Sequence, residues 1–237
     1  MKQDTLKITN VLSDPTRFSI YEYITKKREG VTVSEIAEEF SIHSNVARLH
    51  LTKLEDVSMI ISELKKTGKG GRPSRFYLLS DKVIHLQFPY RDFQRLAQLS
   101  LEALADLGDE GLKALKQVGY KYGFESAEFY VRQKNLEVTQ LSVQEKANCI
   151  EEIATNQGLN PEIEYVEGKE EIHFTIHNCT FKELIHIHPV SLCSMHHELF
   201  NGIFSYFFGK SNLKEEILMN DSSSHACSYS KVVLEGN

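Results

Sequence analysis

The clearest capacity for metal chemistry lies in the last third of this chain, where three cysteines occur close to histidines. Cys179 follows a strand pattern, Cys193 begins a helical pattern and Cys227 begins another strand pattern. His196 comes three residues after Cys193, so both lie on one side of a helix. Thiolate and imidazole donors suit zinc and iron–sulfur iron. Since all three cysteines lie at element ends, we expect one metal site, with the candidate ligands Cys179, Cys193, Cys227 and His196.

Other interpretations of these residues stay open. Three cysteines and one histidine also form a common structural zinc site, or the thiols are small buried groups without a metal. The chain has no close Cys-x-x-Cys pair, so spacing alone does not identify a cluster. Cys149 lies near the apolar side of a helical pattern, and we expect it to be a packing residue. Four cysteines do not indicate a disulfide framework.

A second set of residues suits DNA recognition. The sequence predicts a short helix over 33–40, a tight turn and a second helix over 44–57. One face of the second helix is apolar, with Ala47, Leu51, Leu54 and, close by, His50. The other face carries groups that can contact base edges or phosphates: Ser44, Asn45, Arg48, Leu49 and Thr52, with Lys53 at its edge. Thr32 and Glu35 form a capping-box pattern before the first helix, and Ser44 is the expected N-cap of the second.

A basic hairpin follows this helix pair. Two extended segments, 60–65 and 75–79, flank a glycine-rich loop, and the stretch 65–75 has five cations, three glycines and no acidic residue. Such a loop can lie against phosphates or enter the minor groove, and its candidate DNA contacts are Lys69, Arg72 and Arg75. An ordinary basic hairpin tip is the alternative. The order helix, turn, helix, strand, loop, strand predicts a winged helix-turn-helix.

Two segments carry a resemblance to a known family. SNVARLHLTKLE, followed by GKGGRPSRFYLLS, resembles the ArsR-like winged-helix regulators, and most closely the SufR-type iron–sulfur-responsive branch. HNCTF, HPVSLCSMHHELFNGIF and the late Cys227 resemble the C-terminal signature of that branch. The resemblance implies a repressor in which Cys179, Cys193 and Cys227 hold an iron–sulfur cluster. Thr180 departs from it, because a proline often stands there in the branch.

Charge is distributed unevenly along the chain. The net charge is −6, which by itself does not favour a nucleic-acid partner. Residues 1–80, however, carry 13 Lys and Arg against 10 Asp and Glu, whereas residues 81–237 carry 14 against 23. A basic head on an acidic body is compatible with a sequence-reading regulator. No apolar run could span a membrane, and residues 1–14 lack a signal-peptide pattern, so we expect a cytoplasmic protein.

These patterns predict an α+β protein in three parts. Residues 1–80 form the winged helix-turn-helix domain, and residues 81–135 form a helical linker and dimerisation region. Residues 136–237 form a sensor domain of order α-β-β-α-β-β that contains the Cys/His site. Amphipathic helices over 91–107 and 110–133 offer a dimer interface, whereas the Gly119-xxx-Gly123 spacing more commonly indicates helix packing.

The function expected from the sequence is transcription regulation. The expected partners are a double-stranded DNA operator and a second copy of the chain, since one recognition helix reads only a few base pairs. The expected cofactor is an iron–sulfur cluster, with zinc or no metal as alternatives. A winged-helix regulator with a small-molecule or thiol-redox sensor domain is the second interpretation. We do not expect an enzyme, because no HExxH, phosphate-binding glycine loop or catalytic carboxylate pair occurs, although Cys193 with His196 or His197 could serve a thiol nucleophile.

Overall fold

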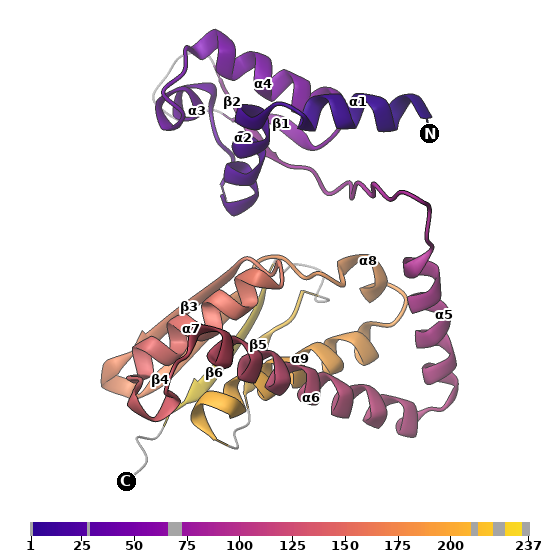
Figure 1. Cartoon of the computed structure of the whole chain (residues 1–237), viewed down its shortest axis with the longest axis vertical. Helices are drawn as coiled ribbons and strands as arrows, with labels where there is room; N and C mark the ends of the chain where they lie inside the picture. Colours follow the sequence, from indigo (N-terminus) through magenta and orange to yellow (C-terminus); the bar gives the residue numbers. More distant parts are fainter. Residues whose placement is uncertain (1, 28, 66–72, 210–212, 220–225, 234–237) are drawn as a thin grey trace. The chain divides into compact units, whose positions relative to one another are not determined.

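The computed structural model (Figure 1) describes residues 2–27, 29–65, 73–209, 213–219 and 226–233. The chain divides into two compact units, residues 1–91 and residues 92–237. The two helices expected to form a separate linker region therefore belong to the second unit. Helix and sheet are both present, as an α+β protein requires. No helix within the described residues is apolar over a length that would cross a bilayer.

The first unit begins with four helices. Their bounds are α1 (Lys2–Leu12), α2 (Pro15–Lys26), α3 (Val33–Glu39) and α4 (Ser44–Asp56). Helix α2 has Pro15 as its first residue, and the side chain of Asp14 accepts a hydrogen bond from the Arg17 backbone N–H. The predicted capping box of α3 is confirmed, with both hydrogen bonds between Thr32 and Glu35 present.

The expected N-cap of α4 was wrong by one residue. His43 is the N-cap, and its Nδ1 accepts a hydrogen bond from the backbone N–H of Asn45. The imidazole nitrogen thereby does what the oxygen of a Ser or Asn cap does, satisfying one free N–H of the first turn. Ser44 is instead the first helical residue and remains exposed.

An antiparallel pair of strands completes the first unit. Strand β1 (Ile60–Lys65) pairs with β2 (Ser74–Leu79), so that Ile60 lies opposite Leu79. The core beneath the helices is apolar and includes Ile20, Ile36, Leu51, Leu54 and Tyr77. This core fixes α3 and α4 against each other and leaves the other side of α4 in solvent.

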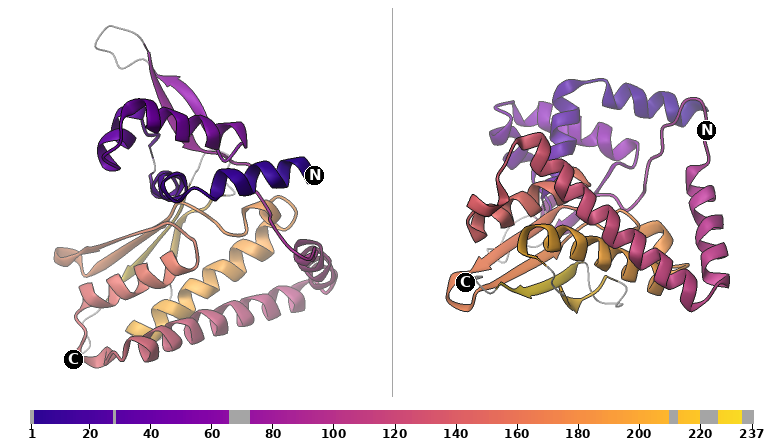
Figure 2. Two further views of the ribbon diagram at one scale, coloured as in Figure 1. Left: turned by 45° about the horizontal axis from the view of Figure 1, so that its top comes forward. Right: turned by 60° about the horizontal axis from the view of Figure 1, so that its bottom comes forward.

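The second unit joins a helical layer to one antiparallel sheet. Its helices are α5 (Phe93–Asp106), α6 (Asp109–Lys134), α7 (Val143–Asn156), α8 (Lys182–Ile185) and α9 (Pro189–Phe208), with short 3-10 turns at Val138–Gln140 and Glu167–Lys169. Its strands are β3 (Pro161–Val166), β4 (Glu171–Ile176), β5 (Lys214–Ile217) and β6 (Cys227–Val232). The strand order is β3-β4-β6-β5. Figure 2 shows α6 and α9 side by side on one side of this sheet.

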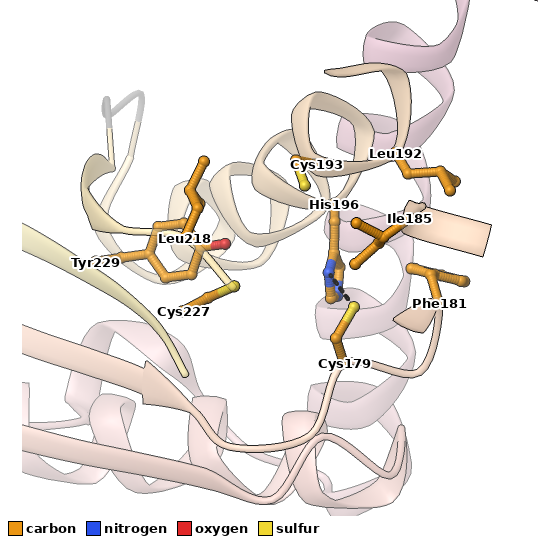
Figure 3. A pocket seen from close by; sticks show the side chains of 9 residues that line it. All are labelled: Cys179, Phe181, Ile185, Leu192, Cys193, His196, Leu218, Cys227 and Tyr229. Atoms are coloured by element: carbon orange, nitrogen blue, oxygen red, sulfur yellow. Dashed lines mark hydrogen bonds between the residues drawn. The ribbon is translucent and has the colours of Figure 1, made fainter. Parts of the chain in front are cut away.

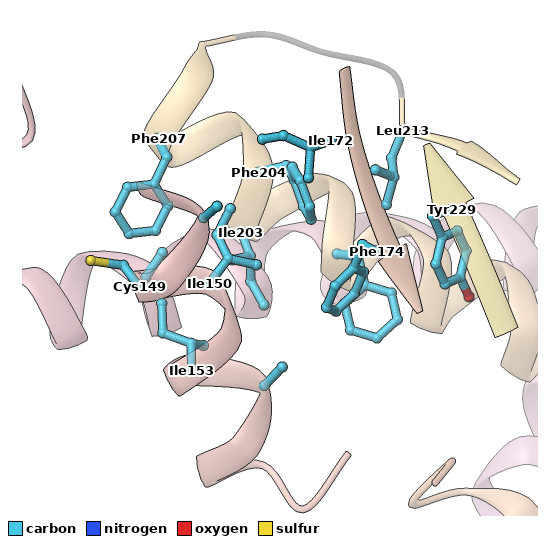
Figure 4. Packing of buried hydrophobic residues seen from close by; sticks show 14 of the residues in the cluster. Cys149, Ile150, Ile153, Ile172, Phe174, Ile203, Phe204, Phe207, Leu213 and Tyr229 are labelled. Atoms are coloured by element: carbon cyan, nitrogen blue, oxygen red, sulfur yellow. The ribbon is translucent and has the colours of Figure 1, made fainter. Parts of the chain in front are cut away.

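Aromatic side chains fill the space between α9 and the sheet (Figure 4). Phe174 of β4 packs against Phe200 and Phe204 of α9, with ring centroids 5.2 and 5.6 Å apart. Ile150 and Ile153 of α7 belong to the same core. The outward side of β4 is polar, in keeping with the alternation predicted for this strand.

The structure bears on two predictions about the central helices, α5 and α6. Gly119 and Gly123 face the backbone of α9, so the Gly-xxx-Gly spacing serves packing within the chain. The apolar side of α5 was expected to offer a dimer interface, and Phe93, Leu96 and Leu107 on it are exposed. Leu101 is the buried residue of α5. The amphipathic pattern correctly predicted the helix, and the dimer interface stays a prediction.

Candidate functional site

The outer face of α4 is a set of exposed polar side chains on a rigid support. Ala47, Leu51 and Leu54 are fully buried beneath the helix. The predicted DNA-contacting residues of this helix are all exposed: Ser44, Asn45, Arg48, Thr52 and Lys53. His50 is buried, which agrees with a structural role for it.

Two side chains on this face are joined by a hydrogen bond. Arg48 Nη1 donates a hydrogen bond to Asn45 Oδ1 at 3.3 Å. Leu49, the residue after Arg48 on the helix, is 56% exposed. Guanidinium, amide and branched apolar groups on one exposed helix face match the groups that base edges offer in a major groove.

The β1–β2 hairpin is tied to the end of α4. Arg75 Nε donates to Ser62 Oγ at 3.0 Å, Ser62 Oγ donates to Glu55 Oε1, and Arg75 also lies 3.8 Å from that carboxylate. Arg75 therefore links the hairpin to α4 while remaining exposed. A hollow beside it is lined by Arg48, Ser62, Leu64, Pro73 and Arg75. The candidate contacts Lys69 and Arg72 lie outside the described residues.

The second candidate site is a small cavity in the second unit (Figure 3). Cys179 reaches it from the segment after β4, Cys193 and His196 from successive turns of α9, and Cys227 from the start of β6. The cavity has a volume of about 10 Å³, which is room for about one water molecule or ion. Its remaining walls are apolar or aromatic: Phe181, Ile185, Leu192, Leu218 and Tyr229.

Cys179 and His196 lie next to each other in this cavity. The Cys179 Sγ atom lies 3.7 Å from His196 Nδ1. Burial raises the pKa of the Cys179 thiol to about 11, although the backbone N–H of Phe181 opposes this by hydrogen bonding to the sulfur. Burial also lowers the pKa of His196 to about 4. His196 is therefore a neutral imidazole at pH 7, which is the form that can bind a metal.

Backbone donors also reach the sulfurs. The Met219 N–H donates to Cys227 Sγ at 3.2 Å, and the Phe181 N–H serves Cys179. Such N–H groups stabilise a thiolate and tune metal–sulfur sites. Neither these donors nor Tyr229, which lines the cavity, was identified from the sequence. A backbone N–H carries no residue-type signal, so only the strand and loop geometry could reveal it.

The cavity brings together the four residues predicted from sequence without placing them in a coordination geometry. Within the described ranges, no group of three or more His, Cys, Asp or Glu side chains is arranged to hold a metal ion. His197 points elsewhere: its Nε2 contacts the Leu213 carbonyl at 2.7 Å, and its Nδ1 lies 3.5 Å from Glu215. Cys149 is buried in the main core, as expected for a packing residue.

Comparison with known proteins bears on the first unit. Residues 12–63 match the family model described as a helix-turn-helix domain. This segment contains α3, the turn and α4. The chain has a helix-turn-helix domain. The match supports a DNA-binding regulator and extends over the region in which the exposed face of α4 was found.

The other comparisons assign nothing further. No curated protein matches the sequence. Among solved structures, a trafficking protein particle complex subunit 3 from Naegleria fowleri, covalently bound to palmitic acid, is similar with a TM-score of 0.43 and 12% identity. The similarity covers 60% of this chain and 97% of that one. A similarity this weak carries no argument about the second unit.

Proposed function

We propose that this protein is a transcription regulator that binds double-stranded operator DNA through α4 and the β1–β2 hairpin. The observation that carries the proposal is the exposed face of α4, where Asn45, Arg48 and Thr52 project from a helix whose opposite face is buried. In a helix-turn-helix domain, the second helix of the pair enters the major groove. The resemblance noted above favours a repressor.

We further propose that the cysteine pocket controls this DNA binding by holding a metal. Cys179, Cys193, Cys227 and His196 would be its ligands, because thiolates and a neutral imidazole are soft donors that suit zinc or iron–sulfur iron. The metal, when bound, would supply the positive charge that keeps the buried thiols ionised. Binding would draw the sulfurs closer together than they lie in the absence of metal.

The size of the cavity favours one metal ion over a cluster. A volume of about 10 Å³ accommodates a single ion, and an iron–sulfur cluster would need a larger space. The thiol-redox alternative is less well supported, because Cys179 and Cys227 are buried and a protonated thiol reacts slowly with oxidants.

A route from the pocket towards the DNA-binding unit passes through α5. Leu101 of α5 packs in the same apolar cluster as Cys179, Ile185 and Leu192. Along the chain, α5 is the first helix after the segment that leaves the helix-turn-helix domain. A change in the pocket would alter the packing of Leu101 and so the position of α5. Such coupling typically changes affinity 5- to 150-fold, or about 1–3 kcal/mol.

Selection from random duplex DNA followed by affinity measurement tests both parts. Wild-type protein should enrich one sequence, and its affinity for that sequence should differ between metal-free and metal-loaded protein. Cys179→Ser should abolish that difference, whereas Cys149→Ser should keep it. Absence of any enriched sequence would refute the DNA-binding proposal, and equal affinities with and without metal would refute the control by metal.

A further inference from the structure

Helix α6 has an apolar stripe that is exposed in the part of the chain that the structure describes. Val118, Tyr122 and Phe129 are 64%, 57% and 66% exposed. Spacings of four and seven residues place them on one side of an α-helix. Gly119 and Gly123 point from a different side of α6, where they contact α9. Three large apolar side chains in line on one helix differ from scattered surface residues and indicate an interaction surface.

A groove lies beside this stripe. It has a volume of about 470 Å³ and runs between α6 and α7. Tyr122, Ser126 and Phe129 line it on the α6 side, and Ile153 and Asn156 line it on the α7 side. The groove is wide enough to admit an aromatic side chain, and its walls offer both apolar and hydrogen-bonding groups.

The stripe has a sequence that suits pairing with itself. Val118 and Phe129 are equally distant from the midpoint between Gly123 and Phe124, and so are Tyr122 and Glu125. In an antiparallel helix pair with its two-fold axis at this midpoint, Val118 meets Phe129 of the other helix. Lys121 and Glu125 are both exposed and lie 3.7 Å apart within one helix. In this pair the position opposite Lys121 is Ser126, so Lys121 lies one residue along the axis from Glu125 of the other helix. A two-fold interface requires this self-complementarity.

We propose that α6 pairs antiparallel with α6 of a second copy of this chain, and that Tyr122 of each copy enters the groove of the other. The centre of the stripe carries one positive and one negative side chain, Lys121 and Glu125. This balance favours a second copy of the chain over a partner whose surface carries one sign of charge. This inference deepens the proposed function, because two recognition helices on two half-sites require paired chains, but its evidence lies wholly in the second unit.

The mass of the full chain in solution tests the proposal. Sedimentation equilibrium in the absence of DNA should show a dimer for wild type. Val118→Glu should weaken dimerisation at least tenfold, whereas Gln117→Glu adds the same charge one residue earlier, off the stripe, and should leave it unchanged. A wild type that stays monomeric at all concentrations, or a dimer that Val118→Glu does not weaken, would overturn the proposal.

Disulfide trapping tests the antiparallel register and remains informative if Val118→Glu folds poorly. Chains with Val118→Cys and chains with Phe129→Cys, mixed and oxidised, should form a covalent dimer, with wild type as the control for native cysteines. A dimer of two Val118→Cys chains, or of two Phe129→Cys chains, should not become covalent. Its two new thiols, one from each copy, would be roughly 17 Å apart at 1.5 Å per residue, beyond disulfide reach. Cross-linking of either chain alone, or failure of the mixture, would refute this register.

Binding of each variant to a single half-site separates this inference from the proposed function. If Val118→Glu is monomeric but still binds a half-site, both proposals stand. If wild type is monomeric and binds a half-site, the α6 pairing alone is wrong. If wild type is dimeric and binds no duplex, the regulator proposal alone is wrong.

Discussion

Gly123 of α6 lies directly against the carbonyl oxygen of Leu199 of α9: a Cβ atom placed on Gly123 would come within 1.9 Å of that oxygen. Gly202 of α9 makes the reciprocal contact, since a Cβ atom placed on it would come within 2.1 Å of the Tyr120 carbonyl oxygen. The two helices therefore touch backbone to backbone. Since α9 carries Cys193 and His196, this contact also fixes where two of the proposed ligands lie.

Gly123→Ala should accordingly destabilise the protein. The added methyl group must push α6 away from α9, and overpacking of this kind costs about 1–3 kcal/mol. Urea denaturation followed by circular dichroism measures the change in the free energy of unfolding. Gly168→Ala is the matched control, since no atom lies within 4 Å of its Cβ position. Equal stability of the two variants would contradict the close contact.

Metal content should depend on the pocket cysteines alone. Protein purified anaerobically should carry stoichiometric zinc or iron, and Cys179→Ser should lose most of it. Cys149→Ser should retain the metal, because Cys149 is buried in a different core. Elemental analysis with an absorption spectrum gives the result and separates a single ion from an iron–sulfur cluster. Metal-free wild type after reconstitution with either element would rule out the proposed site.

Arg48→Ala should reduce discrimination between operator and random DNA. A guanidinium that contacts a base in two places contributes roughly 1–3 kcal/mol, so the ratio of the two affinities should fall about 10- to 100-fold. Fluorescence anisotropy on both duplexes measures it. Arg95→Ala, an exposed arginine on α5, removes the same charge elsewhere and should leave the ratio intact. An unchanged ratio for Arg48→Ala would mean that another face of α4 reads the bases.

Stability should rise with pH because of one buried lysine. Lys231 is 5% exposed, and burial lowers its pKa from 10.5 to about 8. Between these values the unfolded chain binds the proton more tightly, so the free energy of unfolding increases from pH 8 to 10.5. At pH 7 the penalty is fully present, and it amounts to roughly 3 kcal/mol at most.

Lys231→Met should therefore stabilise the protein at pH 7, by on the order of 1–3 kcal/mol, and flatten the rise above pH 8. Urea denaturation at several pH values measures both effects. Lys214→Met is the control, because Lys214 is exposed and paired with Glu216 at 2.8 Å, and it should change stability little. A loss of stability at pH 7 in Lys231→Met would show that the ammonium has a stronger partner than its contact with the Phe208 ring.

Local patterns predicted most of the secondary structure. The helix pair, its two strands and the faces of α4 follow from apolar spacing and from capping residues such as Thr32, which act within a few residues. The N-cap at His43 was missed because histidine seldom fills that position. What covers the apolar side of α5 could not be predicted, since periodicity shows that a face is apolar but not which partner packs on it.

The cysteine pocket was predictable only in part. Residue types and element ends indicated that Cys179, Cys193 and Cys227 would meet, and His196 was favoured by its helical phase. The distances between them depend on how α9 packs on the sheet, through contacts such as Phe174 with Phe200 that join distant parts of the chain. The small volume of the cavity, on which the proposal of a single ion rests, has no counterpart in the sequence.

The burial of Leu101 has a further consequence for motion. Complete burial of one leucine contributes about 2 kcal/mol, and an isolated helix as short as α5 is barely stable in water. Leu104 of the same helix also lies close to α6, where a Cβ placed on Gly111 would come within 1.9 Å of the Leu104 carbonyl oxygen. Helix α5 is therefore held at few points, and whatever tightens or loosens the wall of the cysteine cavity acts on one of them.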